Sequence, residues 1–339
     1  MHHPPPSPPI LFLDWDGTMT KSDTLSLLAN ITGYRHHHPH SSNSSSSSSA
    51  TPPPPLPPWL HFTSAYVHDL AAHRTRYAPA AAARTTIAAE LAWLESLAPV
   101  ERASVERVEA ARVFAGVTPR VVQAAVIEAV TGREEAVVWR TGLSLLVARV
   151  LGAGGVVRVV SVNWSARFIR ACLEAGGSEG TNAAAARGGG GDQGPGRDSV
   201  DWSRVRVHAN EVGEGGDGRL SRYFGDRGIW TAGDKRRVLD EVLDEVGSRA
   251  STIYVGDSPT DLHCLLDVDI GICVRDEPMG SEQRALAETL DRLSIETRWI
   301  GTYQGEGKVD DGDADRVKKS LWWARDFEEI VQSTLFKGS

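Results

Sequence analysis

The stretch ILFLDWDGTMT, residues 10–20, constrains the fold of this chain more than any other. Its first four residues, Ile10 to Leu13, are apolar without polar alternation, which is typical of a strand covered on both faces in a parallel sheet. Two carboxylates, Asp14 and Asp16, follow at once, and Gly17 lets the backbone turn tightly behind them. Because ligands of open parallel sheets collect at the carboxyl ends of the strands, the sequence predicts a polar site here.

The two acids of this stretch need a partner of opposite charge. Residues two apart in a strand share a face, so Asp14 and Asp16 can point into one cleft. Carboxylates about 4 Å apart repel each other by roughly 4 kcal/mol at an effective dielectric near 20. A bound cation would offset this repulsion, whereas the same two acids in a solvated turn would need none.

Three later segments place further polar groups at the ends of predicted elements. Val156 to Val160 is typical of a second strand and is followed by Ser161, whose hydroxyl can bind a phosphoryl oxygen. A helix with apolar spacing opens at Asp234-Lys235, which places the lysine at a helix N-terminus, where anions are favoured. A strand over 253–255 then runs into GDSPTD, residues 256–261. Its two acids can meet the first pair.

In this order, the four segments resemble the motifs of the haloacid dehalogenase (HAD)-like superfamily: DxDGT, a strand-terminal Ser or Thr, a Lys, and an acidic GDxxxD. The chain is similar to the phosphoserine-phosphatase-like branch, in which small residues and an aromatic follow the serine and an Asn-Glu or Asn-Asp step follows a later strand. Here Ser161 to Trp164 and Asn210-Glu211 take those places. The stretch RTGLSLL, which begins at Arg140, resembles the Arg-Pro-Gly helix entry of that family, although Thr141 replaces the proline.

The resemblance covers roughly residues 10–30 and 140–275 and implies an α/β fold. We expect a three-layer, Rossmann-like parallel sheet with helices on both faces and an α-helical cap inserted after the first strand. In the family such a cap closes over the site and excludes water. Past residue 261 we expect a strand at 270–274, and Trp299-Ile300 with a helix over 326–333 that cover a sheet edge. The boundaries we expect are 1–30 and 136–339 for the catalytic core and 59–135 for the cap.

The resemblance also implies the roles of the site residues. Asp14 would be the nucleophile that forms an aspartyl-phosphate, and Asp16 would be the general acid and then the base for water. Mg2+ would be bound by the Asp14 side chain, the Asp16 backbone carbonyl and Asp257, as expected for a hard cation. The groups that hold the phosphoryl oxygens would be Thr18, Ser161 and Lys235.

Other polar residues near these motifs have less definite roles. Asp261 would orient Lys235 or a metal-bound water. The candidates for contacting the leaving group of the substrate are Asp23, Asn163, Trp164 and Glu211. Each has a structural alternative, in that order a helix cap, a turn former, a core side chain and a surface acid. The sequence does not identify the substrate.

Two segments have compositions that favour disorder. Residues 36–58 consist almost entirely of His, Ser and Pro, and residues 177–199 are rich in Gly, Ala and Asn. Neither can bury enough apolar surface to offset the entropy of ordering. We expect 36–58 to be a disordered insertion before the cap and 177–199 to be a flexible loop of the core. Four histidines within 36–40 could bind a transition metal, but a flexible tract is the simpler interpretation.

Charge and composition exclude several classes of function. The net charge of -8 without a basic stripe argues against a nucleic-acid partner. The three cysteines have no metal-ligand spacing, which predicts reduced core thiols. No apolar run reaches the roughly 18 residues that span a bilayer, and the first residues, MHHPPPSPP, do not resemble a signal peptide. We therefore expect a cytoplasmic protein without a membrane partner, whose oligomeric state stays open.

A Mg2+-dependent phosphatase acting on a small phosphorylated metabolite is the function that the sequence favours. Three alternatives remain. A true haloacid dehalogenase would need neither Asp16 nor Asp257. A phosphotransferase or mutase would share every motif. A non-catalytic, HAD-like regulatory or binding protein would have no need to keep mutually repelling carboxylates.

Overall fold

The computed structural model describes residues 8–30, 57–131, 137–176, 200–212, 217–221, 223, 228–247, 250–304 and 320–336. Nearly all of the His/Ser/Pro-rich segment 36–58 and the whole of 177–199 lie outside these ranges. The predictions made for those two segments therefore stay predictions.

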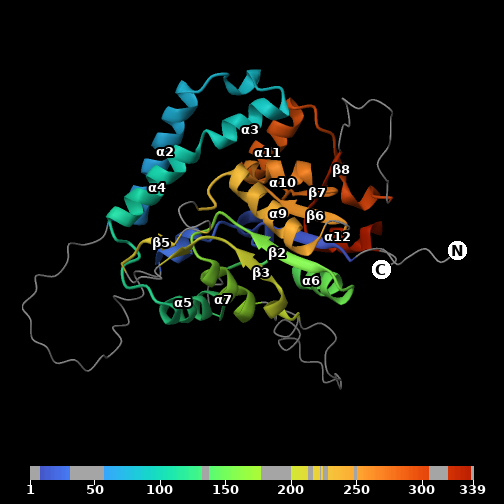
Figure 1. Cartoon of the computed structure of the whole chain (residues 1–339), viewed down its shortest axis with the longest axis horizontal. Coiled ribbons are helices and arrows are strands. Elements are labelled where there is room, and N and C mark those ends of the chain that lie inside the picture. Colours follow the sequence, from blue (N-terminus) through green and yellow to red (C-terminus); the bar gives the residue numbers. More distant parts are fainter. Residues whose placement is uncertain are drawn as a thin grey trace, which may run out of the picture.

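Seven of the described strands form one parallel sheet in the order β3-β2-β1-β6-β7-β9-β8 (Figure 1). These strands are β1 Ile10–Leu13, β2 Val156–Val160, β3 Arg206–His208, β6 Thr252–Gly256, β7 Ile270–Val274, β8 Thr297–Trp299 and β9 Leu321–Ala324. A separate antiparallel pair joins β4, Glu211–Val212, to β5, Leu220–Ser221. The predicted strands at 10–13, 156–160 and 270–274 are confirmed to the residue.

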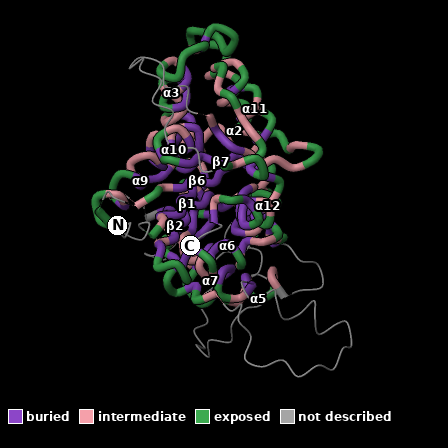
Figure 2. Tube along the Cα trace, turned by 90° about the vertical axis from the view of Figure 1, so that its right-hand side faces the viewer, coloured by how far each residue is buried: buried purple, intermediate pink, exposed green. Residues whose placement is uncertain are grey.

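Helices cover both faces of the sheet. Those of the core are α5 Pro119–Thr131, α6 Leu143–Gly152, α7 Ala166–Gly176, α9 Ala232–Val246, α10 Leu262–Asp267, α11 Ser281–Arg292 and α12 Phe327–Gln332. Side chains of β1 alternate between two apolar clusters: Ile10 and Phe12 face α9, α10 and α11, whereas Leu11 and Leu13 face α5, α6, α7 and α12. Figure 2 shows the strands as the buried centre between these layers. The predicted three-layer α/β fold is confirmed.

Three helices between β1 and β2 arch away from this core (Figure 1). They are α2 Trp59–Arg76, α3 Ile87–Glu95 and α4 Ala98–Ala110. Helix α2 packs along α4, and α3 contacts α9 of the core. None of the described helices is both long and apolar enough to cross a bilayer.

The helices of the interval 59–135, which we expected to form the cap, do not all pack together in the structure. Its last helix, α5, packs against α7 in the core layer (Figure 1). The apolar positions Val122 and Val126 are buried in the same cluster as Phe168 of α7. Spacing along the sequence predicted this helix, but it could not show which neighbour covers the apolar face.

The far edge of the sheet also differs from the expectation. We expected Trp299-Ile300 to cover a sheet edge. Instead, residues 297–299 form the edge strand β8 itself. The run LWWA at 321–324, which we did not predict as a strand, forms β9 between β7 and β8. The predicted helix over 326–333 is confirmed as α12, which Asp326 caps by accepting from the Glu329 N–H. It packs on α6.

Candidate active site

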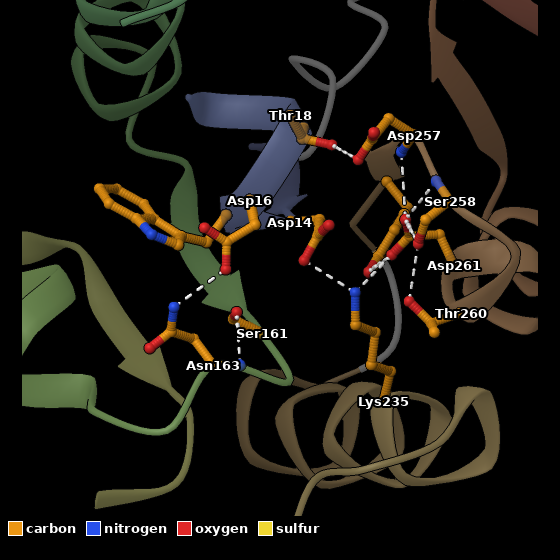
Figure 3. A network of polar contacts seen from close by, with 12 residues as sticks. Asp14, Asp16, Thr18, Ser161, Asn163, Lys235, Asp257, Ser258, Thr260 and Asp261 are labelled. Atoms are coloured by element: carbon orange, nitrogen blue, oxygen red, sulfur yellow. Dashed lines mark hydrogen bonds and ion pairs between the residues drawn. The ribbon is translucent and has the colours of Figure 1, made fainter. Parts of the chain in front are cut away.

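Three predicted site residues each follow a strand at the centre of the sheet. Asp14 comes directly after β1, Ser161 after β2 and Asp257 after β6. Strand β1 pairs with both β2 and β6, so the parallel arrangement brings the three residues to the same edge (Figure 3). All three are at least 96% buried. The sheet therefore places two carboxylates and one hydroxyl around one point, as the sequence predicts.

A tight turn after β1 requires glycine for two reasons. The turn spans Trp15–Met19, and the Thr20 N–H closes it by donating to the Trp15 carbonyl. Gly17 has a φ of +74°, which side chains other than glycine adopt rarely. A Cβ at this position would also lie 2.3 Å from Asp257 Oδ2. The turn thus lets the Asp257 carboxylate approach the backbone closely.

Lys235 enters the site from the first turn of α9. That helix begins at Ala232, two residues before the predicted start, and Thr231 and Asp234 form a capping box at its N-terminus. The fully buried ammonium of Lys235 lies 2.7 Å from Asp14 Oδ1 and 2.7 Å from Asp261 Oδ1. Two of its three protons are used, so one remains for a further acceptor. The ion pairs raise the pKa of Lys235, which keeps the amine charged despite burial.

Asp261 is held in place on both oxygens. Its Oδ1 accepts from Lys235 and from the Tyr254 hydroxyl at 2.7 Å. Its Oδ2 accepts from the Asp257 and Ser258 N–H groups at 3.1 and 3.0 Å, and from the Ser258 hydroxyl. This carboxylate therefore orients Lys235 and the loop after β6. Tyr254 escaped the sequence analysis, because one tyrosine in the run TIYVG is typical of strand core.

Two carboxylates of the site each have an oxygen that could bind a cation. Oxygens of Asp14, Asp257 and Asp261 lie within 4.8 Å of one another. Asp14 uses Oδ1 for Lys235 and Asp257 uses Oδ1 for Thr18, and the other oxygen of each accepts no hydrogen bond from the described residues. Burial, with repulsion from Asp261, raises the pKa of Asp14 well above its usual range and that of Asp257 to about 7. A cation would relieve this cost.

Asp16 points away from Asp14 toward different partners (Figure 3). Its Oδ1 accepts from the Thr24 N–H and hydroxyl, both at 2.7 Å, and its Oδ2 accepts from Asn163 Nδ2 at 2.9 Å. Burial, with repulsion from Asp23, raises the pKa of Asp16 to about 6, although these hydrogen bonds oppose the shift. A carboxyl with a pKa near neutrality suits proton transfer. The sequence analysis did not identify Thr24, because no local pattern ten residues after Asp14 indicates a contact with Asp16.

The two predicted phosphate-binding hydroxyls differ in their present partners. Ser161 Oγ accepts from the Asn163 N–H at 3.0 Å, so its proton remains available to a phosphoryl oxygen. The Thr18 hydroxyl instead donates to Asp257 Oδ1 at 2.9 Å. Thr18 would therefore have to change partner to donate to a ligand.

All four candidates for the leaving group have structural partners, and three of them lie on or beside the strands and helices of the core. Asn163 donates to Asp16 and Thr24, and its Oδ1 accepts from the Ser165 N–H. Trp164 is buried and meets the rings of Trp59 and Phe114 edge to face. Glu211 accepts from the Ser165 hydroxyl and the Arg167 N–H at the start of α7.

Asp23 is the fourth candidate. It is exposed, and its Oδ1 accepts from the Leu25 N–H at the start of a helical stretch over 25–30. It also repels Asp16, so it lies near the predicted acid. A role in contacting the leaving group stays a prediction for all four candidates.

No family model matches this chain, and no curated protein matches it. Solved structures that match this chain include a substrate-bound phosphoserine phosphatase complex, at 12% identity and a TM-score of 0.46, over 97% of this chain and 99% of that one. A HAD family hydrolase from Salmonella enterica subsp. enterica serovar Typhi matches at 13% and 0.39, over 80% of this chain and 64% of that one. A phosphoserine phosphohydrolase-like protein from Francisella tularensis subsp. tularensis SCHU S4 matches at 11% and 0.39, over 95% and 98%.

Proposed function

We propose that this protein is a Mg2+-dependent phosphatase that hydrolyses a small phosphomonoester through an aspartyl-phosphate on Asp14. The observation that carries the proposal is the division of partners between the two acids after β1. Asp14 lies against Lys235 and beside Asp257, while Asp16 is held apart by Thr24 and Asn163. One acid is thus arranged for attack and the other for proton transfer.

In the proposed first step, one carboxylate oxygen of Asp14 attacks phosphorus and the bond to the leaving oxygen breaks. Protonated Asp16 donates its proton to that oxygen. Lys235 and Ser161 each have a proton to donate to the phosphoryl oxygens. In the second step, ionised Asp16 takes a proton from water as the water oxygen attacks phosphorus. Inorganic phosphate leaves, and the Asp14 carboxylate is regenerated.

The residues present fit Mg2+ as the metal of this site. The side chains of Asp14 and Asp257 each have a carboxylate oxygen without a hydrogen bond from the described residues, and the Asp16 backbone carbonyl is the third proposed ligand. Mg2+ is commonly bound through one or two carboxylates together with substrate phosphate. When bound, it would neutralise negative charge on the phosphoryl group. Asp261 is excluded as a proposed ligand, because both of its oxygens accept bonds from other groups.

An assay of the purified protein against a panel of phosphomonoesters, with Mg2+ and with EDTA, tests this function. We expect phosphate release only with Mg2+, and its loss in Asp14→Asn. The variant should melt at or above the temperature of the wild type without metal, because it removes one of three clustered charges. A matched control is Asp291→Asn, which changes an acid of α11 outside this cluster and should keep full activity.

Two results would contradict the proposal. More than a few per cent of activity in Asp14→Asn, once deamidation is excluded, would require another nucleophile. No hydrolysis of any phosphomonoester by the wild type would favour a regulatory or binding protein on this fold.

Addition of an alcohol acceptor separates a phosphatase from a phosphotransferase, because only the latter would transfer most of the phosphoryl group to the alcohol.

A further inference from the structure

Arg140 has a complete set of partners at the edge of the sheet. The residue is 98% buried, and its guanidinium makes five hydrogen bonds, one for each of its N–H donors. Nε donates to the Thr18 carbonyl at 2.9 Å and Nη2 to the Gly17 carbonyl at 2.7 Å. Nη1 donates to the Arg325 carbonyl at 2.9 Å. The remaining two donors bind both oxygens of Asp276, at 2.6 and 3.1 Å.

These five bonds join three strand ends that are far apart in the chain. Gly17 and Thr18 belong to the turn after β1, Asp276 follows β7 by two residues, and Arg325 follows β9 directly. Asp276 is itself held from α11, where the buried Gln283 side chain donates to its carboxylate at 2.7 Å and accepts from its N–H at 2.8 Å. The guanidinium therefore has a fixed anchor on one side and the turn on the other.

The same two turn residues contact the proposed metal ligand. The Thr18 hydroxyl donates to Asp257 Oδ1, and the Gly17 backbone leaves no room for a side chain beside that carboxylate. A shift of this turn would therefore change the separation of Asp14 from Asp257. Arg140 holds the carbonyls of both turn residues, and none of its five hydrogen bonds goes to Asp14 or Asp257.

We propose that Arg140, anchored by Asp276, is a positioning residue that sets the turn after β1 against Asp257. The role rests on the proposed function, because its effect on turnover requires that this edge of the sheet is the active site. Lysine cannot replace it. An ammonium has three donors on one nitrogen, whereas this position needs donors spread over three carbonyls and two carboxylate oxygens.

The first test is Arg140→Lys, which keeps the charge but not the five bonds. We expect kcat to fall about 10-fold to 100-fold, since small misplacements of reacting groups cost rates of this order. The Mg2+ concentration for half-maximal activity should rise by a similar factor, because residues that orient ligands affect metal affinity to that extent. Amide hydrogen exchange should become faster over residues 15–20 and stay unchanged in β2 and β3.

Arg158→Lys is the matched control for loss of a buried arginine. Arg158 lies on β2 and is 94% buried, but it is only loosely paired with Glu245, at 3.9 Å. This variant should lose stability without any change in the Mg2+ requirement. A second test variant, Asp276→Asn, weakens the anchor and keeps Arg140, so it should shift kcat and the Mg2+ requirement in the same direction by a smaller factor. If Arg140→Lys does not fold, Asp276→Asn decides.

The proposal is wrong if the folded test variants keep kcat and the Mg2+ requirement within twofold of the wild type. It is also wrong if they change no more than Arg158→Lys does. If the wild type hydrolyses nothing, the proposed function fails separately. Amide exchange over residues 15–20 and Mg2+ binding measured by calorimetry would then still decide whether Arg140 positions the turn.

Discussion

At the residue scale, the two acids after β1 differ in the groups that they bond, although they lie only two residues apart in the chain. Asp14 bonds a lysine, whose charge favours the carboxylate needed for attack. Among the described residues, Asp16 bonds neutral donors alone, the Thr24 N–H and hydroxyl and the Asn163 amide. Burial, with repulsion from Asp23, raises the pKa of Asp16 to about 6, whereas at Asp14 the larger effect of burial is opposed by the charge of Lys235. One site thus holds one acid suited to attack and one suited to proton transfer.

Asp16→Asn should therefore slow the two steps unequally. Para-nitrophenolate leaves without protonation, so Asp14 should still be phosphorylated, while hydrolysis of the aspartyl-phosphate lacks its base. Steady-state turnover should fall about 100-fold to 10,000-fold. Rapid-quench measurements should show a burst of nitrophenol approaching one equivalent per site, and an alkyl phosphate should show none. Equal losses for both substrates with no burst would contradict the divided roles.

At the element scale, the α2–α4 pair contains a half-buried acid outside the proposed site. The Tyr66 hydroxyl donates to Glu101 Oε1 at 2.7 Å where the two helices pack. Burial raises the pKa of Glu101 to about 7, although the bond from Tyr66 opposes the shift. In the unfolded chain the pKa returns to near 4.5. The folded state therefore binds more protons than the unfolded state between these two values.

This difference predicts that stability falls as pH rises from 4.5 to 7 and then levels off, so far as Glu101 is concerned. Glu101→Gln keeps the acceptor for Tyr66 and removes the titration. Between pH 5 and pH 8, the free energy of unfolding of the variant should rise by about 1–2 kcal/mol relative to that of the wild type. This is less than the full pKa shift implies, because Glu101 is partly exposed. Urea unfolding at the two pH values measures the gain. An equal difference at both would contradict it.

At the scale of the whole molecule, a buried ion-pair cluster attaches the arch of α2–α4 to the core. Glu90 of α3 accepts from Arg84 at 2.7 Å and from Arg292 of α11 at 2.9 Å, with its side chain only 3% exposed. The Arg292 guanidinium also donates to the Arg84 carbonyl. A second contact joins Glu95 of α3 to Thr231, the N-cap of α9. These contacts attach the arch to the core beside α9, the helix that carries Lys235.

Glu90→Gln should lower the free energy of unfolding by roughly 3 kcal/mol, because it leaves two largely buried guanidinium groups without their anion. Glu296→Gln is the control, since its pair with Arg298 is exposed and should cost less than about 1 kcal/mol. Denaturant titration of both variants gives the comparison. Similar small losses in the two would mean that the buried cluster does not fasten the arch.

The sequence by itself determined the places where polar groups follow strands. Apolar runs before Asp14, Ser161 and Asp257 predicted three strands, and the structure has each residue directly after its strand. Helical spacing with a glycine stop likewise predicted α9, which ends at Gly247 with a φ of +83°. These features could be predicted because strand and helix patterns depend on neighbouring residues.

Only the tertiary structure decided which of these groups act together. Arg140 meets Thr18 across 122 residues of chain, and Asn163 meets Asp16 across 147. The same holds for α5, whose apolar face is covered by the core helix α7 rather than by the cap. The physical reason is that periodicity records which side of an element is apolar, and not which distant segment will cover it. The burial that raises the pKa values of Asp14, Asp16 and Asp257 arises only when those segments meet.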